Sequence, residues 1–430
     1  MTMGEKKIQP DISTVMLHEA YDPAGHLGAT CMPLFQNSAF AHRTAEELEA
    51  IFANRAAGFA YSRIGNPTVN SFEERIRRAE GGMFATATAS GSAAITSTVL
   101  TIFRSGDEII LPTGLYGGTI DLFRDLEAFG IHAVYVDPFT PENVEAAVTQ
   151  HTKAVFAETI GNPKLNVIDI REIADCAHRL GLPFIVDNTT ATPVLIRPLS
   201  LGADIVIHSA SKYINGNGSA ISGVIIDGGS FDWSDEKYAV MGEYQKYKKG
   251  AFSARLKNTI WRDTGPCLAP MHAWLNNAGL ETLGLRMKKI CYNASRLAEA
   301  LMEMRGAFDV HYPGLPKSPW KELVERQFDN GLAGGILTFR TGSKEKAFSV
   351  INHLQYALNL SNVGDSKTLV VHPSSTIFSH ASAAEKKAAG VYEDLIRVSV
   401  GLEDIGDLIH DFEQALEKCR KGEGQDGSGL

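Results

Sequence analysis

Two charged residues follow or end short apolar runs of the sequence, where an unpaired buried charge is costly. Lys212 comes after the run IVIHSAS, and Asp187 ends the run PFIVD, 25 residues earlier. Desolvation at the end of a buried strand would lower the pKa of a lysine, and its neutral amine could then form a Schiff base with an aldehyde. A carboxylate that faces a pyridine nitrogen keeps that nitrogen protonated, so the ring withdraws electrons from the attached carbon. The two residues therefore fit an aldehyde cofactor that contains a pyridine ring.

Residues after other apolar runs could bind the other parts of such a cofactor, namely the face of its ring and its phosphate. Tyr116, in YGGT, could stack on the ring and add about 0.5–1.5 kcal/mol beyond area burial. A phosphate binds to backbone N–H groups at a helix N-terminus, which the SGS tripeptide at 90–92 would provide before the helical run AAITSTVLTIF. Ser209 and Ser211, just before the lysine, add hydroxyl groups. The set indicates a site for a phosphorylated pyridine aldehyde.

Each of these residues also has an ordinary structural interpretation. A lysine after a strand is most often a solvated charge, and Asp187 before Asn and Thr is, alone, more often a turn or a helix cap. The run GNGSAISG around Gly216 lacks the third glycine of a dinucleotide-binding fingerprint, which disfavours a nicotinamide-dependent oxidoreductase. The order of the signals along one chain, and not any single signal, favours the phosphorylated aldehyde.

A scaffold for these residues can be read from the pattern of apolar runs. From about residue 80, short β-rich runs alternate with helix-like segments such as IREIADCAHRLG; the runs are DEIILP, HAVYVD, KAVFAET, PFIVDN, DIVIHS and SGVIID. This alternation predicts an α/β fold with a mostly parallel sheet between helices, in which ligands bind beyond the carboxyl ends of the strands. Further on, helical patterns and the runs GGILTFRT, TLVVHP and LIRVSVG predict a second, smaller α/β domain.

Composition narrows the class of partner and the compartment. The 430 residues carry a formal net charge of −9, which disfavours nucleic acid or an anionic membrane as the main partner. The uncharged stretch 84–103 contains eight Ser and Thr residues and is predicted to be a buried turn and a helix, not a membrane span. The first ten residues lack the apolar core of a signal peptide. Five scattered cysteines without a C-x-x-C pair predict a cytoplasmic protein with neither a disulfide framework nor a metal site.

Seven motifs, in this order, resemble those of the pyridoxal-phosphate-dependent enzymes of cysteine and methionine metabolism, the family of the cystathionine synthases and lyases. The motifs are YSRIGNPT (61–68), ASGSAAI (89–95), LYGGT (115–119), ETIGNP (158–163), VDNTT (186–190), HSASKYINGNG (208–218) and LIRVSVGLED (395–404). The resemblance implies fold type I of the pyridoxal-phosphate-dependent transferases, similar to aspartate aminotransferase. It also implies an N-terminal arm (1–60), a cofactor-binding large domain (61–262) and a C-terminal small domain (263–430).

The resemblance implies catalytic and substrate-binding roles for particular residues. Lys212 resembles the lysine that binds the cofactor covalently, Asp187 the partner of the pyridine nitrogen, and Tyr116 the residue stacked on the ring. Arg397 resembles the clamp for the substrate α-carboxylate, and Asn362 is implied to be a second substrate-binding residue.

The resemblance also implies which residues hold the rest of the cofactor. Asn162 occupies the position that contacts the cofactor 3-oxygen. Tyr61 and Arg63 would reach across a subunit interface to the phosphate of a neighbouring subunit, and an Arg fork suits a phosphate dianion. Such a chain would be at least a dimer, and similar proteins are tetramers, which predicts a homotetramer built as a dimer of dimers. The other implied phosphate ligands are Gly91, Ser92, Ser209 and Ser211.

Three features favour the O-acetylhomoserine sulfhydrylase branch of the family. They are the run NVGDSKTLVVHPSST (362–376), the extended stretch 228–270 that ends in RDTGPCLAP, and Gly118 where methionine γ-lyases carry Cys. The implied reaction is a γ-replacement that converts O-acetyl-L-homoserine and sulfide, or a thiol, to L-homocysteine, or methionine, and acetate. Ser92 stands where the sulfhydrylases usually have Gln, and INGNG replaces the more usual GGHG type of run.

Other activities stay open at this point. They are a γ-lyase, a cystathionine γ-synthase-type enzyme acting on another homoserine ester, and a pyridoxal-phosphate-binding protein without turnover. The sulfur donor and the acyl group of the substrate are not distinguished by any motif.

Overall fold

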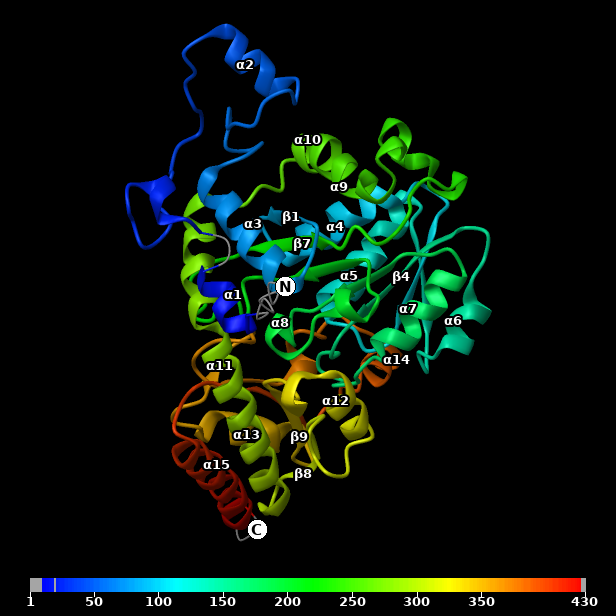
Figure 1. Cartoon of the computed structure of the whole chain (residues 1–430). Coiled ribbons are helices and arrows are strands. Elements are labelled where there is room, and N and C mark those ends of the chain that lie inside the picture. Colours follow the sequence, from blue (N-terminus) through cyan, green and yellow to red (C-terminus); the bar gives the residue numbers. More distant parts are fainter. Residues whose placement is uncertain (1–9, 19–20, 427–430) are drawn as a thin grey trace, which may run out of the picture.

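A seven-stranded sheet forms the centre of the larger part of the molecule (Figure 1). The computed structural model describes residues 10–18 and 21–426, so the signal-peptide prediction falls mostly outside the described residues. The strand order is β1-β7-β6-β5-β4-β2-β3, and β7 is antiparallel to both of its neighbours while β2 to β6 pair in parallel. The strands are β1 (Phe84–Thr88), β2 (Glu108–Pro112), β3 (His132–Val136), β4 (Thr152–Glu158), β5 (Phe184–Asp187), β6 (Ile205–His208) and β7 (Gly223–Asp227). The six runs predicted from the sequence are β2 to β7.

Helices cover both faces of this sheet. On one face lie α3 (Pro67–Glu80), α7 (Ile170–Arg179) and α11 (Pro270–Glu303), and on the other lie α4 (Gly91–Ile102) and the segment 231–261. Successive side chains of β5 alternate between the two apolar cores, Phe184 and Val186 into the first and Ile185 into the second. This alternation directs Asp187, the last residue of β5, to the α4 face.

The uncharged stretch 84–103 forms a strand and a helix. Ser90 caps α4 by accepting the N–H of Ala93 at 3.0 Å. The helix was predicted, but β1 was not, because FATAT alternates Ala and Thr instead of forming an apolar run. Its pairing with β7, a tertiary contact, makes it a strand. Within residues 10–18 and 21–426, no helix combines the length and the apolar character that a membrane crossing needs.

A second, five-stranded sheet lies beside the first in the order β10-β11-β12-β9-β8. The long α11 packs against α3 of the larger part and against β8, β9 and α15 of the smaller part. The elements of the smaller part are β8 (Phe308–His311), α12 (Lys321–Gln327), β9 (Ile336–Arg340), α13 (Lys344–His353), β10 (Leu358–Asn359), β11 (Leu369–Val371), α14 (Ala383–Ala388), β12 (Leu395–Ser399) and α15 (Ile405–Asp426). The three strand runs predicted here are β9, β11 and β12, and the predicted smaller α/β unit is therefore present.

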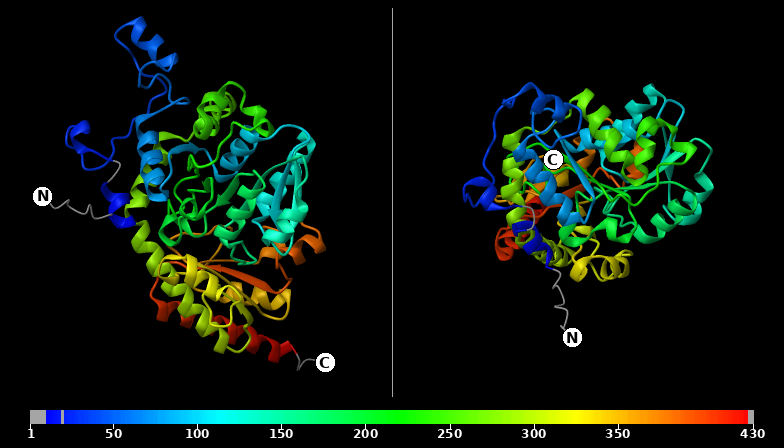
Figure 2. Two further views of the ribbon diagram at one scale, coloured as in Figure 1. Left: turned by 45° about the vertical axis from the view of Figure 1, so that its right-hand side comes forward. Right: turned by 45° about the horizontal axis from the view of Figure 1, so that its top comes forward.

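The described residues before position 61 form an arm. Its helix α1 (Ile12–His18) contacts α3 and α11, whereas the segment with α2 (Ala45–Phe52) stands away from the sheets in Figure 1 and in the left view of Figure 2. α2 buries none of its residues, and Phe52 is 62% exposed. The remaining helices are α5 (Gly117–Leu126), α6 (Pro141–Ala147), α8 (Thr192–Leu195), α9 (Ala251–Arg255) and α10 (Arg262–Thr264). The domain boundaries at 60 and 262 stay predictions, although each sheet lies within one predicted domain.

Candidate active site

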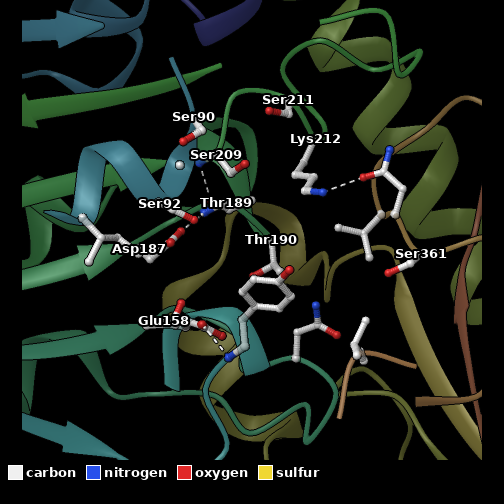
Figure 3. Close-up of a pocket in the computed structure, with 18 of the residues that line it drawn as sticks. Ser90, Ser92, Glu158, Asp187, Thr189, Thr190, Ser209, Ser211, Lys212 and Ser361 are labelled. Carbon is white, nitrogen blue, oxygen red and sulfur yellow. Dashed lines mark hydrogen bonds between the residues drawn. The ribbon is translucent and has the colours of Figure 1, made fainter. Parts of the chain in front are cut away.

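A cavity of about 220 Å³ lies at the carboxyl ends of β4, β5 and β6, where the larger part meets the smaller part (Figure 3). The carboxyl ends of parallel strands are the expected ligand site of such a sheet. The structure brings together here ten of the residues singled out in the sequence: Gly91, Ser92, Tyr116, Asn162, Asp187, Ser209, Ser211, Lys212, Asn362 and Arg397. In the view of Figure 3, Asp187 and Glu158 lie on the opposite side of the cavity from Lys212 and Ser361.

Lys212 lies on the loop that follows β6 and extends into the cavity. Its Nζ donates a hydrogen bond to Oδ1 of Asn362 at 2.6 Å. Burial, together with the nearby positive charge of Arg397, lowers the pKa of Lys212 to about 8. At pH 7 about a tenth of the amine is therefore neutral, far more than for an ordinary lysine, and the neutral amine can attack a carbonyl carbon.

Two carboxyl groups face the cavity from neighbouring strands. Asp187 ends β5 and accepts the N–H of Thr189 at 2.9 Å, and Glu158 ends β4 and accepts the N–H of Tyr116 at 2.8 Å. Burial raises the pKa of both groups, and the nearby Asp187 raises that of Glu158 further. Ionised carboxylates in this position need a cation to face them, which a protonated ring nitrogen would supply.

The N-terminus of α4 closes one end of the cavity. A Cβ atom at Gly91 would lie 2.6 Å from Cβ of Ser209, so only glycine lets the helix end approach the residue that follows β6. Ser92 and Ser209 place their hydroxyl groups at this helix end. The hydroxyl of Ser211 is already engaged, because it donates to the carbonyl of Ser222 at 3.0 Å and accepts its N–H at 2.8 Å. A helix end with hydroxyl groups beside it is an arrangement that can hold an anion.

Arg397 reaches the cavity from β12 and is 3% exposed. It donates to Oδ1 of Asn162 at 3.2 Å and to the carbonyl of Asn362 at 2.9 Å. Burial lowers its pKa to about 10, and its buried Nε has no partner among the described residues. A buried guanidinium with an unused donor is a site for a carboxylate.

Tyr61 and Arg63 do not line this cavity. Both residues are exposed, and the Arg63 guanidinium lies over the Tyr61 ring, 5.6 Å from its centroid. Arg63 also donates to the carbonyl of Arg262. Within the described residues of one chain, the two predicted phosphate ligands are thus separate from the other ten.

Some residues of the cavity were not predicted from the sequence. Glu158 follows the run KAVFA in the same way as Asp187 follows PFIV, so its position was a usable signal. Thr189 and Thr190 lie within the motif VDNTT, but only its aspartate was singled out. The apolar residues Ile95, Ile221, Val363 and Ile377 complete the wall.

Known proteins are similar to this chain over nearly its whole length. Residues 13–417 match the model of the family described as Cys/Met metabolism PLP-dependent enzyme, and the chain belongs to this family.

Particular relatives lie within one branch. The O-acetyl-L-homoserine sulfhydrylase of Corynebacterium glutamicum is 40% identical over 419 residues, which cover 93% of this chain and 95% of that protein. The homocysteine synthase of Schizosaccharomyces pombe is 38% identical and covers 94% of this chain and 97% of its own. A crystal structure of a putative O-acetylhomoserine (thiol)-lyase from Campylobacter jejuni is 34% identical with a TM-score of 0.91, covering 95% of this chain and 100% of that one. That crystal structure contains N'-pyridoxyl-lysine-5'-monophosphate.

The chain is therefore a pyridoxal-phosphate-dependent enzyme of type I fold. The cavity fits this cofactor on its own geometry. It contains the amine of Lys212, whose pKa is lowered, and the buried carboxyl of Asp187. It also contains the end of α4, which can approach Ser209 only because residue 91 is glycine. Within the described residues, no cluster of three or more metal-ligating side chains is present.

Proposed function

We propose that this chain catalyses γ-replacement on O-acetyl-L-homoserine, in which sulfide or a thiol displaces acetate to give L-homocysteine or methionine. The full-length relatives carry the names of this activity. The observation that carries the proposal is the single cavity in which Lys212, Asp187 and Arg397 meet. A γ-replacement needs an amine that moves protons, a protonated ring and a carboxylate clamp, and these three residues supply them.

In the proposed reaction each residue acts on a stated atom. Bound pyridoxal phosphate supplies an electron sink for the negative charge that develops at the substrate Cα. Arg397 binds the α-carboxylate, and the amine of Lys212 removes and returns protons at Cα and Cβ. Asp187 would hold a proton on the ring nitrogen, and Tyr116, which also lines the cavity, would lie against the ring. Acetate leaves from Cγ with the bonding electrons, and sulfide forms the new C–S bond there.

The remaining residues hold the cofactor in this proposal. Asn162 would contact the 3-oxygen, Asn362 would orient the substrate, and the N-terminus of α4 would hold the phosphate. The proposed phosphate ligands are Gly91, Ser92, Ser209 and Ser211. A direct contact from Ser211 requires its hydroxyl to turn away from Ser222, so we expect Ser209 to contribute more.

The product of one assay tests this function. The purified enzyme with pyridoxal phosphate is incubated with O-acetyl-, O-succinyl- or O-phospho-L-homoserine, with and without sulfide, and the products are identified by mass spectrometry. We expect homocysteine and acetate from the acetyl ester only when sulfide is present. Accumulation of 2-oxobutyrate with or without sulfide would contradict the proposal and assign a γ-lyase. The same assay with methanethiol identifies whether methionine is a product.

Substitution of Arg397 by lysine is expected to weaken binding of the amino-acid ester. A lysine cannot make the two-pronged contact of a guanidinium, so KM should rise roughly 10- to 100-fold with a smaller change in kcat. Steady-state kinetics measure the two constants separately. Arg340→Lys is the matched control, because Arg340 lies on β9 of the same sheet and pairs with Asp394 away from the cavity. An unchanged KM in Arg397→Lys would show that Arg397 does not bind the substrate carboxylate.

We also propose that Tyr61 and Arg63 complete the cavity of a neighbouring subunit in a homotetramer built as a dimer of dimers. Their exposure and their distance from the cavity of their own chain support this, as does the uncovered α2 of the arm. Free, scattered cysteines support a cytoplasmic location.

Mixing two inactive variants tests the shared site. When Arg63→Ala and Lys212→Ala subunits are dissociated and reassociated together, the mixture should recover about a quarter of wild-type activity. The reason is that half of the dimers are hybrids of the two variants, and each hybrid has one intact site of its two. A mixture of Lys212→Ala with Asp187→Asn is the control, because both defects lie in the same cavity and no hybrid site is intact. Equal activity in the two mixtures would place Arg63 outside the partner's site.

A further inference from the structure

Glu158 is a buried carboxyl group of the cavity that has no part in the proposed reaction. It is the last residue of β4, is 6% exposed and pairs in register with Asp187, the last residue of β5. Its Oε1 accepts the backbone N–H of Tyr116 at 2.8 Å, whereas its Oε2 makes no hydrogen bond within residues 10–18 and 21–426. Burial of a carboxyl group is costly, so its presence beside a second carboxyl group points to a role other than packing.

Tyr116 connects the large sheet to α5 and carries the ring that would lie against the cofactor. Leu115, just before it, is buried in the core that contains α4, but Tyr116 itself is 41% exposed. The two residues that follow Tyr116 are glycines, which have no side chain that could hold it in place. Within the described part of the chain, the bond to Glu158 is the only hydrogen bond that Tyr116 makes outside α5.

The bond to Glu158 fixes the orientation of the peptide group that leads into Tyr116. Apolar packing of Leu115 is not directional, whereas a hydrogen bond is, so packing alone does not set the rotation of this peptide plane. Tyr116 has φ −53° and ψ 133°, which are not helical values, so α5 does not set it either. A Cβ atom at Gly118 would lie 2.6 Å from Cε1 of Tyr116, so the ring lies directly over the first turn of α5. The place of the ring therefore depends on the backbone that Glu158 holds.

We propose that Glu158 is a positioning residue, whose side-chain oxygen holds the backbone of Tyr116 so that the tyrosine ring lies against the ring of the bound cofactor. The inference rests on the proposed function, in which Tyr116 takes this place. The bond needs an acceptor oxygen and not a negative charge. Burial, and then the nearby Asp187, raises the pKa of Glu158 well above its ordinary value, and a neutral carboxyl group still accepts through its carbonyl oxygen. Glu158 can thus hold Tyr116 without placing a second negative charge beside Asp187.

Two substitutions of Glu158 separate the acceptor from the charge. Glu158→Gln keeps an acceptor oxygen, and Glu158→Met keeps the length of the side chain but offers only a weakly accepting sulfur. In the enzyme loaded with pyridoxal phosphate, Glu158→Met should lower kcat/KM about 10- to 100-fold, the cost of a misplaced group near the reacting atoms, and weaken the visible circular-dichroism band of the cofactor. Glu158→Gln should bring kcat/KM back to within about threefold of the wild type and restore the band. Equal losses in the two variants would overturn the inference.

A double-mutant cycle distinguishes action through Tyr116 from general damage to the site. When Glu158→Met is added to Tyr116→Ala, kcat/KM should fall by less than about threefold further, because the ring that Glu158 positions is already absent. A further loss as large as in the wild-type background would overturn the inference. A Tyr116→Ala enzyme with the wild-type kcat/KM and circular-dichroism band would instead contradict the proposed role of Tyr116, and the inference would fall with it. The product assay above tests γ-replacement independently of both results.

A carboxyl group at the other edge of the sheet provides the control. Asp204 is 1% exposed and accepts the N–H of Phe184, at the start of β5, at 2.9 Å. Asp204→Leu also removes a buried acceptor of a backbone N–H, and we expect a lower melting temperature with the cofactor band retained. Loss of the band as large as in Glu158→Met would overturn the inference. Hydrogen exchange of the wild type, followed by mass spectrometry, needs no variant: the N–H of Tyr116 should be protected, and rapid exchange would overturn the inference as well.

Discussion

The Lys212→Ala variant is expected to lose turnover by about 10⁴-fold, the upper range for removal of a general acid–base, because the same amine also binds the cofactor. Among residues 10–18 and 21–426, no other amine lines the cavity. The measurement is kcat with O-acetyl-L-homoserine and sulfide, together with the absorbance spectrum of the protein after gel filtration. We expect both the turnover and the absorbance band of the covalently held cofactor to disappear.

Lys164→Ala is the control for this experiment. Lys164 also follows a strand of the large sheet, but it pairs with Thr113 and Asp137 outside the cavity. This variant should retain the spectrum and kcat of the wild type. A Lys212→Ala protein that kept the spectrum and turnover would refute the assignment of Lys212.

The Asp187→Asn variant is expected to lower kcat by about 10²- to 10³-fold, comparable to the loss of one preorganised electrostatic group. Asparagine keeps the oxygen that accepts the N–H of Thr189, so the local backbone should be preserved. It cannot hold a proton on the ring nitrogen by charge, and the electron sink is weakened. Steady-state kinetics and the rate of exchange of the substrate Cα proton with solvent measure the effect.

Asp227→Asn is a close match for comparison. Asp227 is also buried at the end of a strand and accepts the N–H of the residue two positions later, Gly229, at 2.8 Å. Because β7 is antiparallel to its neighbours, Asp227 lies at the edge of the sheet away from the cavity. Similar losses of kcat in the two variants would indicate general damage to the sheet and would argue against a specific role for Asp187.

Much of the fold was predictable because short local runs of residues identify its strands. The runs that became β4, β5 and β6 are short, rich in Val, Ile and Phe, and followed at once by polar residues. In a parallel sheet this order places the polar residues together at one edge, which is why Asp187 and Lys212 could be expected in one cavity. The prediction of a role for Arg397, in contrast, depended on the family resemblance. The sequence around Arg397 does not indicate which residues face its side chain.

The features that the sequence did not reveal depend on contacts between distant segments. β1 is a strand because β7 pairs with it, and Glu158 is a cavity residue because its strand lies next to β5. The hydroxyl of Ser211 is occupied by Ser222, eleven residues later, across a loop whose path no local pattern predicts. The place of Tyr61 and Arg63 depends on a second subunit, which a single chain does not contain.

The structure also gives a physical account of the INGNG run after the lysine. Gly216 has φ +77°, and a Cβ atom there would lie 2.2 Å from the guanidinium of Arg286. That guanidinium donates to the carbonyl of Tyr213 at 2.6 Å. Asn215 and Asn217 both accept the N–H of Ser219, at 2.9 Å and 3.2 Å. The asparagines thus close a polar turn that fixes the loop next to Lys212.

The most direct measurement of the central claim is the chemical identity of the residue that holds the cofactor. The pyridoxal-phosphate-loaded enzyme is treated with borohydride, digested, and mapped by mass spectrometry. The account predicts one phosphopyridoxyl group per chain, on the peptide that contains Lys212. A group on a different lysine, or a reduced protein without the group, would contradict the assignment of this cavity as the active site.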